Sequence, residues 1–277
     1  MATYKKEIVS KKRNTKKNKD SKEYLKDFLR ISPFSHALWR TIEALSFEKV
    51  EMESPVLDLG CGFGEFAGVV FNQIEVGIDV NEDDLKKALD GKRYKKLLYA
   101  DARNLPFKDN SYKTVVSVSV MEHIESCEKV IKEVHRVLKK GGKFVFSVPT
   151  PEMKEYLLVY SFLKSIGLKD SAESYWKFHK NIFKHVNLQT HTWWEDKLKK
   201  AGFEIVKKEG TLSPTHLRLH EAFLVTALPS QIGKTFVGKR LVMLVDFRSK
   251  ILPFLFGGLL KQDTDSNINM FFVARKK

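Results

Sequence analysis

The residues that can do the most specific chemistry form a glycine-rich loop that runs from Asp58 to Gly64, within the segment VLDLGCGFG at 56–64. Its glycines permit a tight turn and a close approach of the backbone to a ligand. The dinucleotide fingerprint has the spacing G-x-G-x-x-G and places a pyrophosphate over a helix N-terminus. Here the spacing is G-x-G-x-G, which is one residue shorter.

The carboxylate of Asp58, just before the glycines, indicates which ligand the loop accepts. A carboxylate at this point repels a pyrophosphate, whereas it attracts the ammonium group of a methionine moiety. The loop therefore predicts a nucleoside that carries an amino acid. A nicotinamide-dependent oxidoreductase is the second interpretation, and both the loop spacing and Asp58 disfavour it.

Two further aspartates follow predicted strands. Asp79 lies 21 residues after Asp58, where an acidic residue can accept hydrogen bonds from both hydroxyls of a ribose. In Ala100-Asp101-Ala102, Asp101 can accept from an adenine amino group while the amide of Ala102 serves a ring nitrogen. Taken alone, Asp101 is better interpreted as a helix N-cap or a turn aspartate.

These residues must be positioned by the strands and helices that alternate between residues 55 and 149. The expected strands are Val56–Leu59, Ile74–Val80, Lys96–Ala100, Thr114–Val120 and Lys143–Val148. The expected helices are Phe34–Leu45, Phe63–Phe71, Asp83–Leu89 and Glu128–Leu138. Such alternation indicates an α/β fold with a doubly wound parallel sheet covered by helices on both faces. Because ligands bind at the carboxyl ends of such strands, we expect Asp58 and Asp79 to converge there.

The second half of the chain is less regular. Residues 150–190 are rich in aromatics and histidines, and Pro214–Leu260 is apolar, basic and expected to be largely helical. Between and after them we expect a helix at Trp193–Ala201 and strands at Phe203–Lys208 and Asn269–Ala274. Because there is no internal repeat and no Ser/Gly linker, we expect one domain at 26–277 with insertions at about 150–190 and 211–267 on the acceptor side.

Together these segments resemble the class I, Rossmann-like S-adenosylmethionine-dependent methyltransferases, of the ubiquinone/menaquinone-biosynthesis-like group. The matching residues are VLDLGCGFGEF at 56–66, VGIDV at 76–80, ADARNLPFKDNSY at 100–112, VMEHI at 120–124 and VHRVLKKGGKFVFSVP at 134–149. They occur in the family's order and spacing. The resemblance implies a seven-stranded sheet, mostly parallel with the last strand antiparallel, and an enzyme that uses S-adenosyl-L-methionine as cofactor.

The resemblance also assigns residues to parts of the cofactor. Asp58, Gly60, Cys61 and Gly62 are assigned to the methionine and ribose, with Cys61 as a small packed residue. Asp79 is assigned to the ribose and Val80 to the adenine. Asp101 and Ala102 are assigned to the adenine edge, and Ser117 and Ser119 are expected near the sulfonium. Methyl transfer is an in-line displacement, so the protein must mainly align the acceptor and exclude water.

Histidines are the candidate catalytic residues on the acceptor side. His123 follows the fourth predicted strand and can act as a general base if the acceptor must lose a proton. A histidine with only local hydrogen bonds at a helix start is the alternative. His179, His185 and His191 are further candidates, and their spacing predicts no zinc site, so no metal is expected.

The acceptor is expected to be a small molecule, a glycan or a lipid intermediate. After the fourth strand the chain lacks the Asn/Asp-Pro-Pro-aromatic motif of nucleobase amino methylation, and it lacks the Pro-Cys pair of cytosine C5 methylation. An RNA or protein methyltransferase is the alternative. The apolar runs Leu241–Val245 and Ile251–Leu260 are too short to span a bilayer. They can form helices that lie on a membrane surface. The alternative is a helical cap that packs on the sheet or on a second subunit.

The chain carries a formal net charge of +15, much of it near the N-terminus. Between residues 1 and 22 there are nine Lys/Arg against Glu7 and Asp20, hence 9 − 2 = +7. Residues 1–25 are therefore expected to be a disordered tail, either simply solvated or in contact with RNA or an anionic membrane. The tail lacks the apolar run of a secretory signal and there are only two cysteines, so a cytoplasmic protein is expected. The sequence does not indicate an oligomeric state.

Overall fold

A seven-stranded sheet forms the centre of the computed structural model, which describes residues 19–224 and 244–277. Its strands are β1 (Val56–Leu59), β2 (Ile74–Asp79), β3 (Tyr94–Tyr99), β4 (Tyr112–Val118), β5 (Leu138–Pro149), β6 (Phe203–Gly210) and β7 (Asn269–Lys276). They lie in the order β3-β2-β1-β4-β5-β7-β6. Strands β1 to β5 pair in parallel, whereas β7 is antiparallel to both β5 and β6. The predicted fold class is confirmed.

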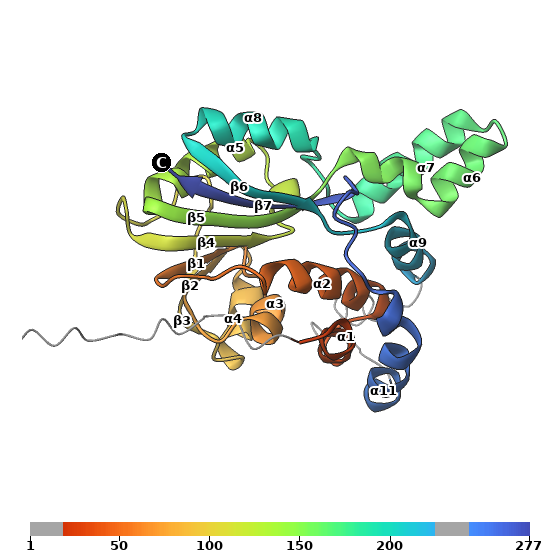
Figure 1. Cartoon of the computed structure of the whole chain (residues 1–277), viewed down its shortest axis with the longest axis horizontal. Helices are drawn as coiled ribbons and strands as arrows, with labels where there is room; N and C mark the ends of the chain where they lie inside the picture. Colours follow the sequence, from red (N-terminus) through yellow and green to blue (C-terminus); the bar gives the residue numbers. More distant parts are fainter. Residues whose placement is uncertain (1–18, 225–243) are drawn as a thin grey trace, which may run out of the picture.

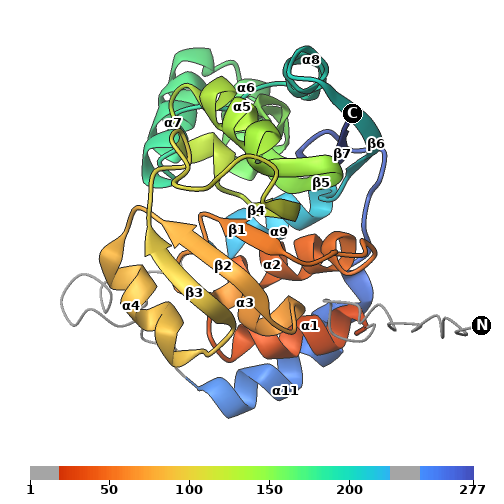
Figure 2. The same ribbon diagram turned by 90° about the vertical axis from the view of Figure 1, so that its left-hand side faces the viewer.

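Helices cover both faces of the sheet, as the sequence predicts (Figure 1). The helices are α1 (Ser21–Leu29), α2 (Phe34–Phe47), α3 (Glu65–Val70), α4 (Glu82–Asp90), α5 (Cys127–Val137), α6 (Leu158–Ser165), α7 (Lys169–Ile182), α8 (His191–Lys200), α9 (Pro214–Ala222) and α11 (Val245–Phe256). Helices α1 to α3 pack on one face, and α5 and α8 on the other. Figure 2 shows α4 beside β3, the edge strand of the sheet.

Strand β4 explains how the two cores are separated. Val116 and Val118 belong to the cluster under α1 and α2, while Val115 belongs to the cluster under α5 and α8. Successive side chains of a strand point to opposite faces, so a strand buried on both faces reads as a nearly continuous apolar run. The carboxyl end of β4 is thereby fixed between two packed layers.

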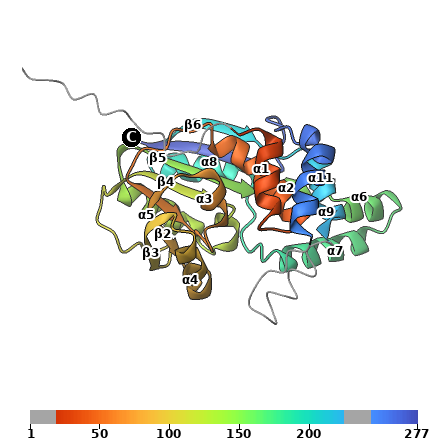
Figure 3. The same ribbon diagram turned by 90° about the horizontal axis from the view of Figure 1, so that it is seen from below.

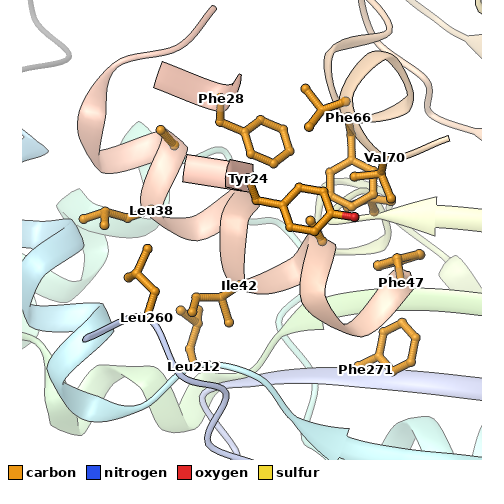
Figure 4. Packing of buried hydrophobic residues seen from close by; sticks show 14 of the residues in the cluster. Tyr24, Phe28, Leu38, Ile42, Phe47, Phe66, Val70, Leu212, Leu260 and Phe271 are labelled. Carbon is orange, nitrogen blue, oxygen red and sulfur yellow. The ribbon is translucent and has the colours of Figure 1, made fainter. Parts of the chain in front are cut away.

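The first core extends to helix α1, which corrects the predicted tail. Asp20 caps this helix by accepting from the backbone amide of Glu23, and Tyr24 and Phe28 are fully buried (Figure 4). The hydroxyl of Tyr24 donates to Glu48 at 2.8 Å. The prediction of disorder was therefore wrong for residues 19–25, because it was based on the charged residues and overlooked the apolar residues on one side of an amphipathic helix. Residues 1–18 lie outside the described part of the chain.

The predicted insertions form helices at the end of the sheet where the parallel strands stop. Helices α6 and α7 pack on each other and α6 contacts α9, whereas α11 packs against α1 (Figure 1, Figure 3). The described residues also form the 3-10 helices η1 (Met121–His123) after β4, η2 (Pro151–Tyr156) before α6 and η4 (Gly257–Leu259) after α11. Within residues 19–224 and 244–277, every helix is too short or too polar to cross a membrane. Most of the predicted run Leu241–Val245 lies outside the described residues.

Candidate functional site

Two adjoining hollows lie at the carboxyl ends of β1, β2 and β4. The larger has a volume of about 510 Å³ and the smaller about 80 Å³, and Gly60 lines both. The predicted residues in the smaller hollow are Asp58, Gly60, Cys61 and Gly62. Those in the larger hollow are Gly60, Asp79, Val80, Asp101, Ala102, Ser119 and His123. The structure thus brings together all the predicted site residues except Ser117.

The loop between β1 and α3 is held open by its backbone. The amides of Gly60 and Cys61 both donate to the carbonyl of Ile78 at 2.9 Å, and Gly60 has a φ of +75°. A Cβ at Gly60 would lie 2.4 Å from a methyl carbon of Val120, so glycine is required there. Gly62 has a φ of +52°, and a Cβ built on it meets no atom within 4 Å. At Gly62 the backbone therefore borders open space that a ligand can enter.

Asp58 is a buried carboxylate at the edge of the smaller hollow. It is 6% exposed and accepts a hydrogen bond from the hydroxyl of Tyr94 at 2.7 Å. Burial raises the pKa of Asp58 to about 7, against the opposing effect of the Tyr94 hydrogen bond. Because desolvation disfavours the charged form, a cationic ligand group beside Asp58 would restore its ionised state. This residue suits an ammonium group, as the sequence predicts.

Asp79 connects the loop to the end of β2. Its carboxylate accepts from the amide of Gly62 at 2.7 Å and from the amide of Asn81 at 2.9 Å. A carboxylate has about four acceptor positions, so two remain for ligand hydroxyls. The adjacent Val80 is 61% exposed and offers an apolar surface in the same hollow. Both residues suit a nucleoside.

Asp101 has a partner that the sequence interpretation did not include. Its carboxylate accepts from the guanidinium of Arg103 at 2.7 and 3.0 Å and from the Arg103 amide at 2.8 Å. These hydrogen bonds lower the pKa of Asp101. Both side chains line the larger hollow, beside the buried Ala102. The contact of Asp101 with an adenine amino group stays a prediction.

The two predicted serines behave differently. Ser117 is fully buried inside β4 and lines neither hollow, so the expectation that it lies near the sulfonium is not met. The physical reason is its position inside the strand, opposite Phe146 of β5. Ser119 lies just beyond the strand end with a φ of +50° and lines the larger hollow. It donates to Glu43 Oε1 at 2.6 Å.

A buried ion pair on α2 holds Ser119 in place at the side of the larger hollow. Glu43 is fully buried and accepts from Ser119 and Ser147, each at 2.6 Å, and from Arg40 Nη1 at 2.7 Å. Arg40 lines the smaller hollow together with Asp58. Sequence reasoning missed both residues because α2 precedes the recognised motifs. The only local signal is a charged pair three residues apart on an otherwise apolar helix.

His123 lines the larger hollow on the side where the acceptor is expected. Its Nδ1 lies 3.0 Å from the carbonyl of Lys184, and desolvation lowers its pKa. The neighbouring Glu122 is 2% exposed, and burial raises its pKa to about 8. The ring of His185 lies 5.5 Å from the ring of His123. The structure thus places His123 close to two other residues. His185 is one of the predicted candidates, and Glu122 is a residue that sequence reasoning missed.

The other two candidate histidines lie away from the larger hollow. His179 is 2% exposed and its ring lies 6.5 Å from that of His185. His191 begins α8 and lies 3.9 Å from Glu152. The two rings are not brought to the larger hollow, so a direct role in the chemistry is not supported for them.

Comparison with known families matches two models to this chain. A methyltransferase domain matches residues 57–146, and a DNA methylase model matches residues 104–225. The first range contains β1 to β4 and most of β5, which carry the loop, Asp79 and Ser119.

Characterised relatives point to the same group. The chain is 31% identical over 160 residues to a demethylmenaquinone methyltransferase of Bacillus cereus, covering 52% of this chain and 67% of that protein. It is 29% identical to a ubiquinone/menaquinone biosynthesis C-methyltransferase of Rickettsia felis, over 69% of this chain and 83% of that protein. A sterol 4-C-methyltransferase of Caenorhabditis elegans is 30% identical over 48% of this chain and 39% of that protein.

Other comparisons set the extent of the similarity. Against two proteins of Methanocaldococcus jannaschii, the match spans about half of the relative, 51% in one and 43% in the other. Among solved structures, an S-adenosylmethionine-dependent methyltransferase of Thermotoga maritima superposes with a TM-score of 0.55 at 18% identity. That superposition covers 88% of this chain and 91% of the other. It establishes a common fold.

Proposed function

Because the chain belongs to the class I, Rossmann-like S-adenosylmethionine-dependent methyltransferases of the ubiquinone/menaquinone-biosynthesis-like group, we propose that it methylates a small-molecule, glycan or lipid-intermediate acceptor. The observation that carries the proposal is the meeting of the loop, Asp58 and Asp79 at two adjoining hollows. When bound, the cofactor supplies a methyl group already activated on a sulfonium. The protein has to bind it, orient the acceptor and exclude water.

Each of these residues would bind a different part of the cofactor. Asp58 would face the ammonium group in the smaller hollow, and Asp79 would accept from the ribose hydroxyls with its two remaining acceptor positions. Val80 offers the apolar surface for adenine. Arg40 and Glu43 would fix Ser119 beside the methyl group, since Glu43 accepts from the Ser119 hydroxyl. His123 would serve acceptors that must lose a proton.

A lipid-like acceptor is supported by the apolar surroundings. Val120, Ile124 and Val186 line the larger hollow. The nearby α6–α7 pair exposes large apolar side chains, among them Leu158, Val159, Phe162, Ile166, Phe178 and Ile182. The quinone and sterol enzymes among the relatives act, by name, on acceptors of this kind. The segment after β4, Val118-Ser119-Val120-Met121, lacks the motif of nucleobase amino methylation.

Transfer of labelled methyl groups tests this proposal. We expect that the protein, incubated with methyl-labelled S-adenosylmethionine and fractions of a host lysate, places label in the lipid or small-molecule fraction. The Asp79→Ala variant should leave that fraction unlabelled, because it lacks the ribose-binding carboxylate. Label confined to RNA or protein would overturn the assigned acceptor class, and an absence of label in every fraction would count against methyl transfer itself.

Helix α11 exposes an apolar face that suits contact with a membrane surface. Its outer side exposes Phe247, Phe254 and Leu255 at 61%, 79% and 57%, near helical spacing. Its inner side is fixed, because Arg248 donates to the carbonyl of Leu29 on α1 at 3.0 Å. The exposed charged residues of this helix are Asp246 and Lys250, and a helix with an apolar outer face can lie in the membrane interface. We propose that α11 docks the enzyme on the membrane that holds its acceptor.

Sedimentation with vesicles tests the docking of α11. Phe254→Ser should weaken binding to vesicles of phosphatidylglycerol and phosphatidylcholine at least about tenfold, since removing one phenyl ring from an apolar environment costs about 1.5–3 kcal/mol. Tyr99→Ser is the matched control, because Tyr99 is 63% exposed at the end of β3, away from α11. Equal binding of both variants and the unaltered protein would refute the docking role.

A further inference from the structure

Glu122, His123 and His185 form a compact group beside the larger hollow. One potential ligand atom from each lies within 4.8 Å of the others. Nε2 of His123 is 3.7 Å from Oε1 of Glu122. His123 also lines the hollow, together with Val186, the neighbour of His185. The group therefore adjoins the space that we assign to the cofactor and acceptor.

Backbone contacts fix the two segments that carry this group. The amides of Val186 and Asn187 both donate to the carbonyl of Glu122, at 3.0 and 2.9 Å. Nδ1 of His123 lies at hydrogen-bonding distance, 3.0 Å, from the carbonyl of Lys184. When Nδ1 donates to a carbonyl, Nε2 is left with a lone pair in a fixed direction, as is usual for metal-bound histidines. The three side chains are thus held together before any ligand binds.

Two buried atoms of the group have no hydrogen-bond partner among the described residues, Oε2 of Glu122 and Nδ1 of His185. Leaving buried polar atoms unpaired is costly, and such atoms are rare in folded proteins. A cation between the two side chains would give both residues a partner. We propose that Glu122, His123 and His185 bind a divalent transition-metal ion.

The donor set selects the kind of ion. Two imidazoles and one carboxylate suit Zn²⁺, Mn²⁺, Fe²⁺ or Co²⁺ better than they suit Mg²⁺ or Ca²⁺, which prefer sites made only of oxygen ligands. A tetrahedral zinc ion with bonds of about 2.1 Å needs ligand atoms about 3.4 Å apart, so atoms that now lie within 4.8 Å of one another must approach by at most about 1.4 Å. The nearby cation Arg40 is paired with Glu43, which offsets its charge. Three protein ligands leave a coordination position open.

The open position gives the ion a role that rests on the proposed function. At this position the ion would bind the hydroxyl oxygen of an acceptor and lower the pKa of that hydroxyl. Because Nε2 of His123 then binds the ion, this residue does not act as the base. The hydroxyl proton leaves to solvent, the oxygen forms the new bond to the methyl carbon, and the carbon–sulfur bond breaks. Its electron pair stays on sulfur, which gives S-adenosylhomocysteine. The metal site thus narrows the acceptor to a hydroxyl compound.

Zinc binding to the untagged full-length protein, without cofactor or acceptor, tests the site. Equilibrium dialysis should give one bound Zn²⁺ for each chain. Glu122→Gln and His185→Ala should each weaken zinc binding at least tenfold, and Co²⁺ bound to the unaltered protein should show visible absorption bands that these variants lose. His135→Ala is the matched control, because His135 lies on α5 against Phe203, away from the group.

The outcomes separate the site from the proposed function. Zinc binding that is absent, or that is equal in all four proteins, overturns the site and leaves methyl transfer standing. Zinc that binds as expected, in a protein that never transfers label, overturns the proposed function and leaves the site standing. Affinity for S-adenosylmethionine, measured on His185→Ala, checks that the variant is folded.

Discussion

Replacing Asp79 by alanine is expected to weaken the binding of S-adenosylmethionine at least about 100-fold, through the loss of two hydrogen bonds to a charged group. The carboxylate has two acceptor positions left for the ribose, and each hydrogen bond to a charged group is worth about 1.5–3 kcal/mol. The change also removes the acceptors of the amides of Gly62 and Asn81. The loop then loses the side chain that joins it to β2.

Titration calorimetry with S-adenosylmethionine and S-adenosylhomocysteine measures this effect. Asp79→Asn should fall between alanine and aspartate, because an amide oxygen can still accept from one loop amide or one hydroxyl. Asp83→Ala is the control, since the Asp83 side chain is 80% exposed on the neighbouring helix α4. Near-wild-type affinity of a folded Asp79→Ala protein would remove Asp79 from the cofactor site.

The sequence could predict this part of the site because its determinants are local. The strand β1, the loop and the start of α3 are consecutive, and the strand–helix alternation alone places the ends of β1 and β2 side by side. Asp58 and Asp79 therefore come together in any sheet of this topology. The prediction failed at Ser117 because a few residues along one strand decide whether a side chain is inside the sheet or beyond its end.

The remainder depends on pairs that are far apart in the chain. Glu43 meets Ser119 across 76 residues and Ser147 across 104. His185 reaches Glu122 only because the turn after α7 docks on the segment after β4. Neither pair has a spacing that identifies it in a single sequence. Residues 19–25 show the converse case, in which charge hid an apolar stripe that buries Tyr24 and Leu25.

The largest expected loss of stability comes from Glu43→Ala. Glu43 is fully buried and its carboxylate accepts from Arg40, Ser119 and Ser147. Without it, the largely buried guanidinium of Arg40 loses a salt-bridge partner and two hydroxyls lose their acceptor. Breaking a buried pair by removing one member costs about 3–5 kcal/mol, so the free energy of unfolding should fall by that amount.

Urea unfolding followed by circular dichroism measures the effect of Glu43→Ala against two other variants. Glu53→Ala removes a carboxylate that is 33% exposed and pairs with Lys113 and Lys143, so a loss of at most about 1 kcal/mol is expected. Glu43→Gln keeps an acceptor for one serine and should lie between them. Because Ser119 lines the larger hollow, Glu43→Ala should also weaken cofactor binding. A loss no greater than that of Glu53→Ala would show that Arg40 finds another partner, and that the position of Ser119 does not depend on the ion pair.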